Sequence, residues 1–330
     1  MDAHRIVVIG GGTGSFTLLS GLKRYGGNIT AIVNMVDDGG STGQLRDELG
    51  VLPPGDVRQC LVALSQSPRV RDLFNYRFSE GSFEGHAFGN LFLTALEKMT
   101  GSFAEAIDIA DEVLNVRGSV VPVTLDNVRL RMRQRSGEDI VGEWQIGTMA
   151  FKLGELRPLL ELSPQATLNT AAKQAIEQAD IVVIAPGNLY GSIAPALLVD
   201  GMQQALATTN AKIVYVCNLV TKPGQTDDFY VHDFADEIER FVGVPVLDYV
   251  IYNTEQPELE LLEKYQRDAE YGVRYDKQVL KERQYVAKGY KLLAKDTPEF
   301  AAADKISGQR SFIRHNPDAV ARQIMRIYFS

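Results

Sequence analysis

Three consecutive glycines directly after a short apolar segment constrain the fold of this chain more than any other feature. The apolar segment covers residues 6–9, and after it come Gly10, Gly11, Gly12, Thr13, Gly14 and Ser15. An apolar helical pattern then begins, so the order predicts a strand, a tight turn and a helix. Glycine permits the turn because it has no Cβ. The helix start offers free N–H groups and a partial positive charge, which suit a phosphate.

The glycine turn matches the dinucleotide fingerprint G-x-G-x-x-G only in part, since Ser15 stands at the third glycine position. A tight turn without a ligand is the alternative reading. The next apolar run, residues 29–36, ends in Asp37 and Asp38 and then GGSTG, which includes Ser41 and Thr42. A carboxylate at this place holds a ribose in dinucleotide folds. Two adjacent carboxylates can equally bind Mg²⁺ beside phosphates.

Composition and charge exclude several classes of protein. The net charge of −8 over 330 residues argues against a dedicated nucleic-acid binder, which would be basic. No apolar stretch approaches the ~20 residues of a membrane helix, and the N-terminus leads straight into a strand, so we expect no signal peptide. Cys60 and Cys217 lie in apolar runs. Buried free thiols fit a cytoplasmic location.

Strand-like and helical patterns alternate along the chain, and this predicts an α/β fold with a mostly parallel sheet. Helices are expected at 56–64 (with Asp56 as a cap), 86–93, 103–113 and 171–179, and apolar strands at 180–185, 212–217 and 246–251. Fully apolar strands are typical of the centre of a parallel sheet. Charged helices are expected beyond about residue 255. We expect one domain over residues 1–330.

Residues 119–147 follow a different pattern, which predicts a hairpin-bearing insertion. Residues 128–135 alternate strictly, a turn follows at 136–137, and 140–146 form the returning strand. One face of the first strand carries Arg129, Arg131, Arg133 and Arg135. These arginines can bind an anion, but a solvated face paired with Glu138, Asp139 and Glu143 is favoured.

Polar loops follow three further strands, and parallel strands present such loops at one edge of the sheet. They begin at residues 186, 218 and 252, so a ligand crevice is predicted there. Gly187, Asn188 and Ser192 can contact a second anion or a sugar. Asn218 suits a base or a hydroxyl. Lys222 can neutralise a phosphate, although an exposed turn lysine is an equal alternative.

His86 and Asn90 stand four apart on one helix face. His86 can act as a general base, and a structural role is the alternative. No nucleophile elbow, zinc-protease motif or P-loop occurs in the sequence.

These motifs resemble the CofD-like superfamily and, within it, the YvcK-type gluconeogenesis factors. The matching text is IVVIGGGTGS, VNMVDDGGSTGQLRDELGVLPPGDVRQCLVALS, HAFGNLFLTAL, APGNLYGSIAPALL, YVCNLVTKPGQTDDF and IRHNP. The resemblance implies a Rossmann-like, doubly wound fold with helices on both faces of the sheet. It further implies a cytoplasmic protein that binds a UDP-sugar and links carbon metabolism to cell-wall precursors and cell shape.

The enzymatic branch of the superfamily is the second hypothesis. It transfers 2-phospho-L-lactate from a guanosine-linked donor to a deazaflavin alcohol, with Mg²⁺. DDGGSTG followed by LPPGDVRQ favours the regulatory branch. The resemblance also implies that Arg314 contacts the nucleotide, and a surface arginine is the alternative. Asp38 is the candidate metal ligand, and cell-wall biosynthesis proteins or a second copy of the chain are candidate partners.

The complete prediction for the nucleotide site gathers residues from six parts of the chain. They are Gly11, Gly12, Thr13, Gly14, Asp37, Asp38, Ser41, Thr42, Asn90, Gly187, Asn188, Ser192, Asn218, Lys222 and Arg314.

Overall fold

A seven-stranded parallel sheet lies at the centre of the computed structural model, which describes residues 4–133, 139–150, 157–295 and 313–330. The strand order is β10-β9-β8-β7-β1-β2-β3. The strands are β1 (Arg5–Gly10), β2 (Asn28–Val33), β3 (Ser119–Pro122), β7 (Ile181–Ile184), β8 (Lys212–Val216), β9 (Tyr249–Asn253) and β10 (Val286–Tyr290). The chain starts in the middle at β1, winds outward to β3, and returns to β7 to wind the other way. This confirms the doubly wound, Rossmann-like prediction.

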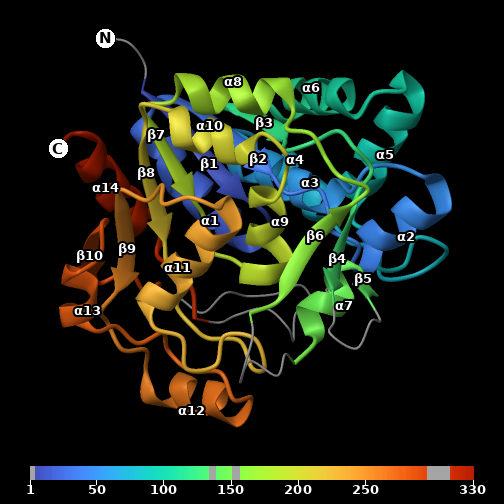
Figure 1. Cartoon of the computed structure of the whole chain (residues 1–330). Coiled ribbons are helices and arrows are strands. Elements are labelled where there is room, and N and C mark those ends of the chain that lie inside the picture. Colours follow the sequence, from blue (N-terminus) through green and yellow to red (C-terminus); the bar gives the residue numbers. More distant parts are fainter. Residues whose placement is uncertain (1–3, 134–138, 151–156, 296–312) are drawn as a thin grey trace.

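Two groups of helices flank the sheet (Figure 1). In one, α1 (Gly12–Leu22) packs against α3 (Pro54–Leu64) and α14 (Pro317–Tyr328). In the other, α8 (Thr170–Gln178), α9 (Ala194–Leu197), α10 (Met202–Thr208) and α11 (Val231–Val242) pack in series. The other helices are α2 (Gly40–Leu49), α4 (Pro68–Asn75), α5 (Phe88–Thr100), α6 (Phe103–Leu114), α12 (Leu259–Arg267) and α13 (Lys277–Lys281). Lys23–Tyr25 form a 3₁₀ turn and Leu189–Ile193 a π-helical turn.

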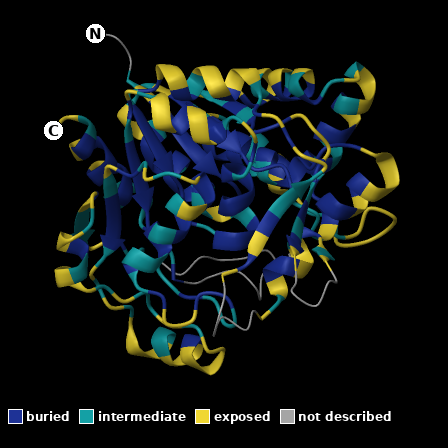
Figure 2. Ribbon diagram, viewed as in Figure 1, coloured by how far each residue is buried: buried dark blue, intermediate teal, exposed yellow. Residues whose placement is uncertain are grey.

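The central strands form the core of the molecule, as their apolar sequences predict. All four residues of β7 are buried, and so are residues 6–10 of β1. Figure 2 shows this buried centre with the outer faces of α8 and α12 exposed. No helix in the described ranges is long and apolar enough to cross a membrane.

The predicted hairpin over residues 119–147 is only partly right. Residues 119–122 form β3, the edge strand of the main sheet, and the separate three-stranded sheet has the order β5-β4-β6. Its strands are β4 (Arg129–Arg133), β5 (Ile140–Val141) and β6 (Leu159–Ser163). The returning strand stops at Val141 because Gly142 has a φ of 121° and α7 (Glu143–Thr148) begins there. β6, which sequence reasoning missed, pairs antiparallel with β4.

The arginines of β4 face carboxylates. Arg131 lies 3.2 Å from Asp139 and 3.3 Å from Glu161, and Arg133 lies 3.0 Å from Glu161. The predicted pairing with Glu143 is wrong, since the described ion pairs of this face use Glu161, Asp139, Asp38 and Asp47 instead. Arg135 and Glu138 lie outside the described residues.

The C-terminal part also departs from the prediction of helices alone. β10 adds an edge strand parallel to β9. Its alternation is weak, and four of its five residues are half-buried, so its sequence carries little strand signal. α14 begins at Pro317, because the Asn316 side chain caps it by accepting from the Ala319 N–H at 2.9 Å.

Candidate functional site

A cleft of about 560 Å³ opens beyond the carboxyl ends of β1, β7 and β8. This is the point where the chain changes direction in the sheet, and open α/β sheets bind ligands there. Most of the predicted residues line it together: Gly11, Gly12, Thr13, Gly14, Gly187, Asn188, Ser192, Asn218, Lys222 and Arg314.

The glycine turn forms the floor of the cleft. Gly11 is the N-cap of α1, no side chain caps the helix, and its first turn holds no acidic residue. Gly12 has a φ of 60°, which favours glycine. Gly14 lies against the Pro186 carbonyl, where a Cβ would collide with it. The helix start therefore presents its N–H groups and positive dipole end to the cleft.

The loops after β7 and β8 form a second wall and are joined by Asn218. Its Nδ2 donates to the Gly187 carbonyl at 2.7 Å, and its Oδ1 accepts from the Tyr215 hydroxyl at 3.2 Å. Asn188 accepts from the Gly191 N–H at 3.2 Å and so shapes its own loop. In this structure the Asn218 amide braces two loops.

Lys222 also belongs to this wall. Burial lowers the pKa of its ammonium, while the nearby Glu143 and Glu270 carboxylates oppose that shift. The Lys222 ammonium therefore lines the cleft in a partly desolvated position. A cation in such a position interacts strongly with an anion.

The far wall comes from the end of the chain. Residues 314 and 316 pair with the segment after β10, through Ala294 N–H to the Arg314 carbonyl at 2.8 Å and Asn316 N–H to the Leu292 carbonyl at 2.7 Å. The Ile313 N–H also donates to the Tyr265 hydroxyl at 3.1 Å. This pairing brings Arg314 and His315 to the cleft, and the contact of Arg314 with a nucleotide stays a prediction.

Half-buried carboxylates crowd beside the glycine turn. Burial, and then the charge of Asp37, raise the pKa of Asp56 to about 8. The same two causes, together with Asp56, raise the pKa of Glu143 to about 8, and burial raises that of Asp37. The Asp56 carboxylate lies against Gly11 and accepts from the Gly12 N–H. These groups hold excess negative charge that a cation or protons can relieve.

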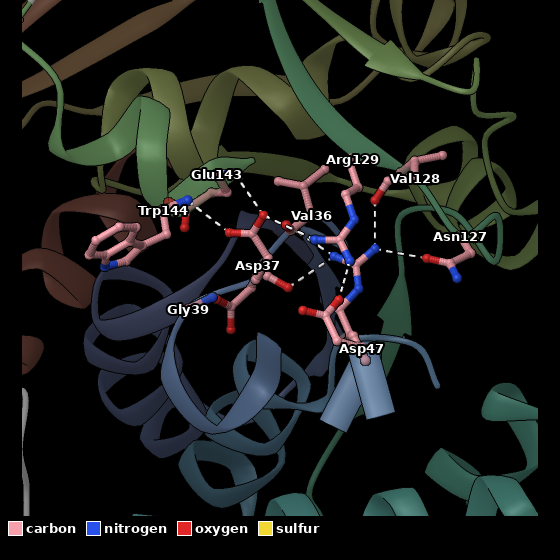
Figure 3. Close-up of polar contacts among 11 residues, drawn as sticks. Val36, Asp37, Gly39, Asp47, Asn127, Val128, Arg129, Glu143 and Trp144 are labelled. Atoms are coloured by element: carbon pink, nitrogen blue, oxygen red, sulfur yellow. Dashed lines mark hydrogen bonds and ion pairs between the residues drawn. The ribbon is translucent and has the colours of Figure 1, made fainter. Parts of the chain in front are cut away.

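Asp38 has a different role from its neighbour. Its Oδ1 accepts from the Trp144 N–H at 2.8 Å, and its Oδ2 accepts from the Glu143 N–H at 3.1 Å. Arg129 lies 3.4 Å from the same Oδ2. Figure 3 shows Arg129, Glu143 and Trp144 gathered beside Asp37. Asp38 thus caps α7, and its role as a metal ligand stays a prediction.

Arg46, which sequence reasoning missed, holds the acidic loop in place. It is buried and donates to the Val36 carbonyl at 3.2 Å and the Asp37 carbonyl at 3.0 Å.

Among the residues that the structure describes, no group of three or more His, Cys, Asp or Glu side chains forms a metal-binding cluster.

Ser41 and Asn90 form a separate network that does not line the cleft. The Asn90 Nδ2 donates to Ser41 Oγ at 3.2 Å, and Ser41 Oγ lies 2.9 Å from His86 Nδ1. The buried Arg58 donates to Asn90 Oδ1 at 2.8 Å. Thr42 instead hydrogen-bonds Asp37. Sequence reasoning missed Arg58 as a part of this network and Asp56 as a neighbour of the glycine turn. Both residues belong to α3, and only the folded chain brings α3 beside that turn.

The fold and the cleft define an α/β protein of the Rossmann-like class with a glycine turn at its switch point. The chain belongs to the CofD family, because the family model described as 2-phospho-L-lactate transferase CofD matches residues 6–296.

The alignments with similar proteins cover most of this chain and most of each relative. A Thermotoga maritima protein, provisionally named a gluconeogenesis factor, is 44% identical over 82% of this chain and 86% of its own. The gluconeogenesis factor of Halalkalibacterium halodurans is 39% identical over 85% of this chain and 87% of its own. The crystal structure of a Bacillus halodurans protein has a TM-score of 0.88 and 35% identity, and covers 98% of this chain and 100% of that one.

Proposed function

We propose that this protein binds a UDP-sugar in the cleft and acts as a nucleotide-responsive regulator of the gluconeogenesis factor type. The observation that carries the proposal is the convergence of the α1 glycine turn, Lys222 and Arg314 on one cleft. The three come from distant parts of the chain, and each suits an anion. The chemistry they share is recognition of a diphosphate.

Each group has a distinct task in this proposal. The N–H groups at the start of α1 receive one phosphate. The Arg314 guanidinium grips the diphosphate through two parallel hydrogen bonds, while Lys222 supplies a point charge. Gly187, Asn188 and Ser192 lie at the start of the second loop and face the attached sugar.

Mg²⁺ fits the carboxylates beside the glycine turn. Asp37 and Asp56 are the candidate ligands, because both are half-buried, desolvation opposes the ionisation of each, and the charge of Asp37 further opposes that of Asp56. Asp38 fits less well, since hydrogen bonds to α7 already occupy both of its oxygens. A bound Mg²⁺ would supply positive charge beside the phosphates.

In the cell, the nucleotide would report the supply of cell-wall precursors, and the loaded protein would adjust carbon flux and cell shape through cell-wall biosynthesis proteins. This role belongs to the cytoplasm. A second copy of the chain is a further candidate partner.

The alternative is a Mg²⁺-dependent 2-phospho-L-lactate transferase with a guanosine-linked donor and a deazaflavin acceptor. The matching family model is described by that activity, and the Asp37 and Asp56 carboxylates suit a metal-dependent transfer as well as binding.

Calorimetric titration separates the two functions. The ligands are UDP-N-acetylglucosamine, UDP-glucose, UDP and GDP, each with and without Mg²⁺. We expect a UDP-sugar to bind at least tenfold more tightly than GDP, a difference of about 1.4 kcal/mol. Clear binding of GDP, with no binding of any UDP-sugar at millimolar concentration, would instead establish the transferase reading.

A further inference from the structure

His315 brings a second kind of recognition to the cleft. It lines the cleft beside Arg314, and only 7% of the residue is exposed. Its Nε2 is buried, and no described residue forms a hydrogen bond with it. A buried ring nitrogen that lacks a partner costs free energy unless a ligand or water bonds to it.

The other ring nitrogen fixes the tautomer of His315. The imidazole forms a hydrogen bond with the Cys217 backbone, and the Cys217 N–H already donates to the Ile251 carbonyl at 2.9 Å. The partner is therefore the Cys217 carbonyl, an acceptor. Since Nε2 has no partner, Nδ1 carries the proton and donates, and Nε2 keeps its lone pair.

The ring is also held neutral and in position. Burial lowers the pKa of His315 to about 4, so Nε2 remains an acceptor at neutral pH. The backbone of residues 314 and 316 is fixed by the pairing with residues 292–294. The cleft therefore contains a rigid, neutral acceptor in addition to its cations.

We infer that His315 Nε2 accepts a hydrogen bond from a neutral N–H or O–H donor of the nucleoside and so sets which nucleotide the cleft accepts. This inference rests on the proposed nucleotide function. Two parts of a nucleoside offer such a donor: the imide N–H of uracil, or the equivalent N–H of guanine, and a ribose hydroxyl. Cytosine and adenine present an acceptor at the corresponding ring position and would leave Nε2 without a partner.

Ligand analogues test the inference on the unmodified protein. Calorimetry would compare UDP with 3-methyl-UDP, CDP, 2′-deoxy-UDP and 3′-deoxy-UDP, or GDP with 1-methyl-GDP if guanosine nucleotides bind. Removal of the single donor that Nε2 accepts should weaken binding about tenfold. The base analogues and the deoxy analogues identify whether the donor belongs to the base or the ribose. Equal affinity for every analogue would overturn the inference while leaving nucleotide binding intact.

A variant links the effect to His315. In His315→Phe the sensitive analogue and its parent nucleotide should bind within about twofold of each other, because the acceptor is gone. His232→Phe is the matched control, since His232 Nδ1 is also buried and lacks a hydrogen-bond partner in the described part of the chain, but His232 does not line the cleft. It should keep the tenfold discrimination. Unchanged discrimination in His315→Phe would assign the effect to another residue and refute the inference.

A spectroscopic readout requires no variant. The ¹⁵N resonance of His315 Nε2 should move on addition of UDP and stay in place on addition of the analogue that lacks the donor. A resonance that does not respond to UDP, under conditions where calorimetry shows saturation, would overturn the inference. Absence of binding by both UDP and GDP would instead remove the proposed function on which it rests.

Discussion

At the scale of single residues, the folded protein opposes the ionisation of Asp56. Its pKa is about 8 against an ordinary value of 3.8, so between these values the folded state keeps a proton that the unfolded chain has released. Stability therefore falls as pH rises through this window. The ionised Asp56 carboxylate therefore destabilises the folded protein when no cation lies beside it.

Asp56→Asn should stabilise the metal-free protein at pH 8, on the order of 2 kcal/mol, and change it little at pH 4. Urea unfolding at both pH values measures the difference. The same variant should lose any Mg²⁺-dependent gain in nucleotide affinity. Identical urea midpoints of parent and variant at pH 8 would show that the folded protein does not oppose this ionisation.

His315 has the opposite pH dependence. Its folded pKa of about 4 lies below the ordinary 6.5, so the unfolded chain takes up a proton first as pH falls. The contribution of neutral His315 to the free energy of unfolding is complete above about pH 6.5 and is lost as the pH falls to 4. The parent should therefore lose up to about 3 kcal/mol more than His315→Gln over this window. Comparing the urea midpoints of the two proteins isolates this residue, and parallel pH curves would contradict the prediction.

At the scale of elements, α7 depends on side chains from the loop after β2 and the loop after β8. Asp38 bonds its first N–H groups, and at its other end Gln225 Nε2 donates to the carbonyls of Ile146 at 2.9 Å, Gly147 at 3.1 Å and Met149 at 2.9 Å. A helix of six residues is not stable alone in water. Its existence therefore follows from tertiary contacts.

Asp38→Ala should cost about 1 kcal/mol through loss of the α7 cap. The fluorescence of Trp144, the single tryptophan of the chain, should report the loosened helix. Asp47→Ala is the matched control, because Asp47 also pairs with Arg129 but does not bond α7. If the two variants unfold at the same urea concentration and keep the parent's fluorescence, the cap is not a stabilising contact.

Local sequence patterns correctly predicted the elements whose structure depends mainly on their own residues. The apolar runs of β1, β7 and β8 and the glycine turn are such elements, and the polar loops after them met at one sheet edge as expected. α7 and β6 were missed because Asp38, Gln225 and β4 supply their partners from distant positions. Asp56 was read only as a helix cap, since no local signal tells that α3 places it against Gly11.

At the scale of the whole molecule, segments near both ends of the chain line the cleft together. β1 and α1 supply its floor, while Arg314 and His315, held beside the segment after β10, supply its far wall. α14 then packs on α1. A ligand that bridges floor and wall should stabilise the entire fold, by about 2.7 kcal/mol at 100 times its Kd.

Titration of a UDP-sugar into the parent, Arg314→Ala and Arg314→Lys tests the central claim most directly. Both variants should bind more weakly, Arg314→Ala by about 1.5–3 kcal/mol, because a charged hydrogen bond is lost and lysine cannot replace the paired grip. Arg133→Ala, at an exposed arginine of β4, should bind as the parent does. Parent-like affinity in Arg314→Ala would contradict the account and leave the C-terminal segment with a structural role alone.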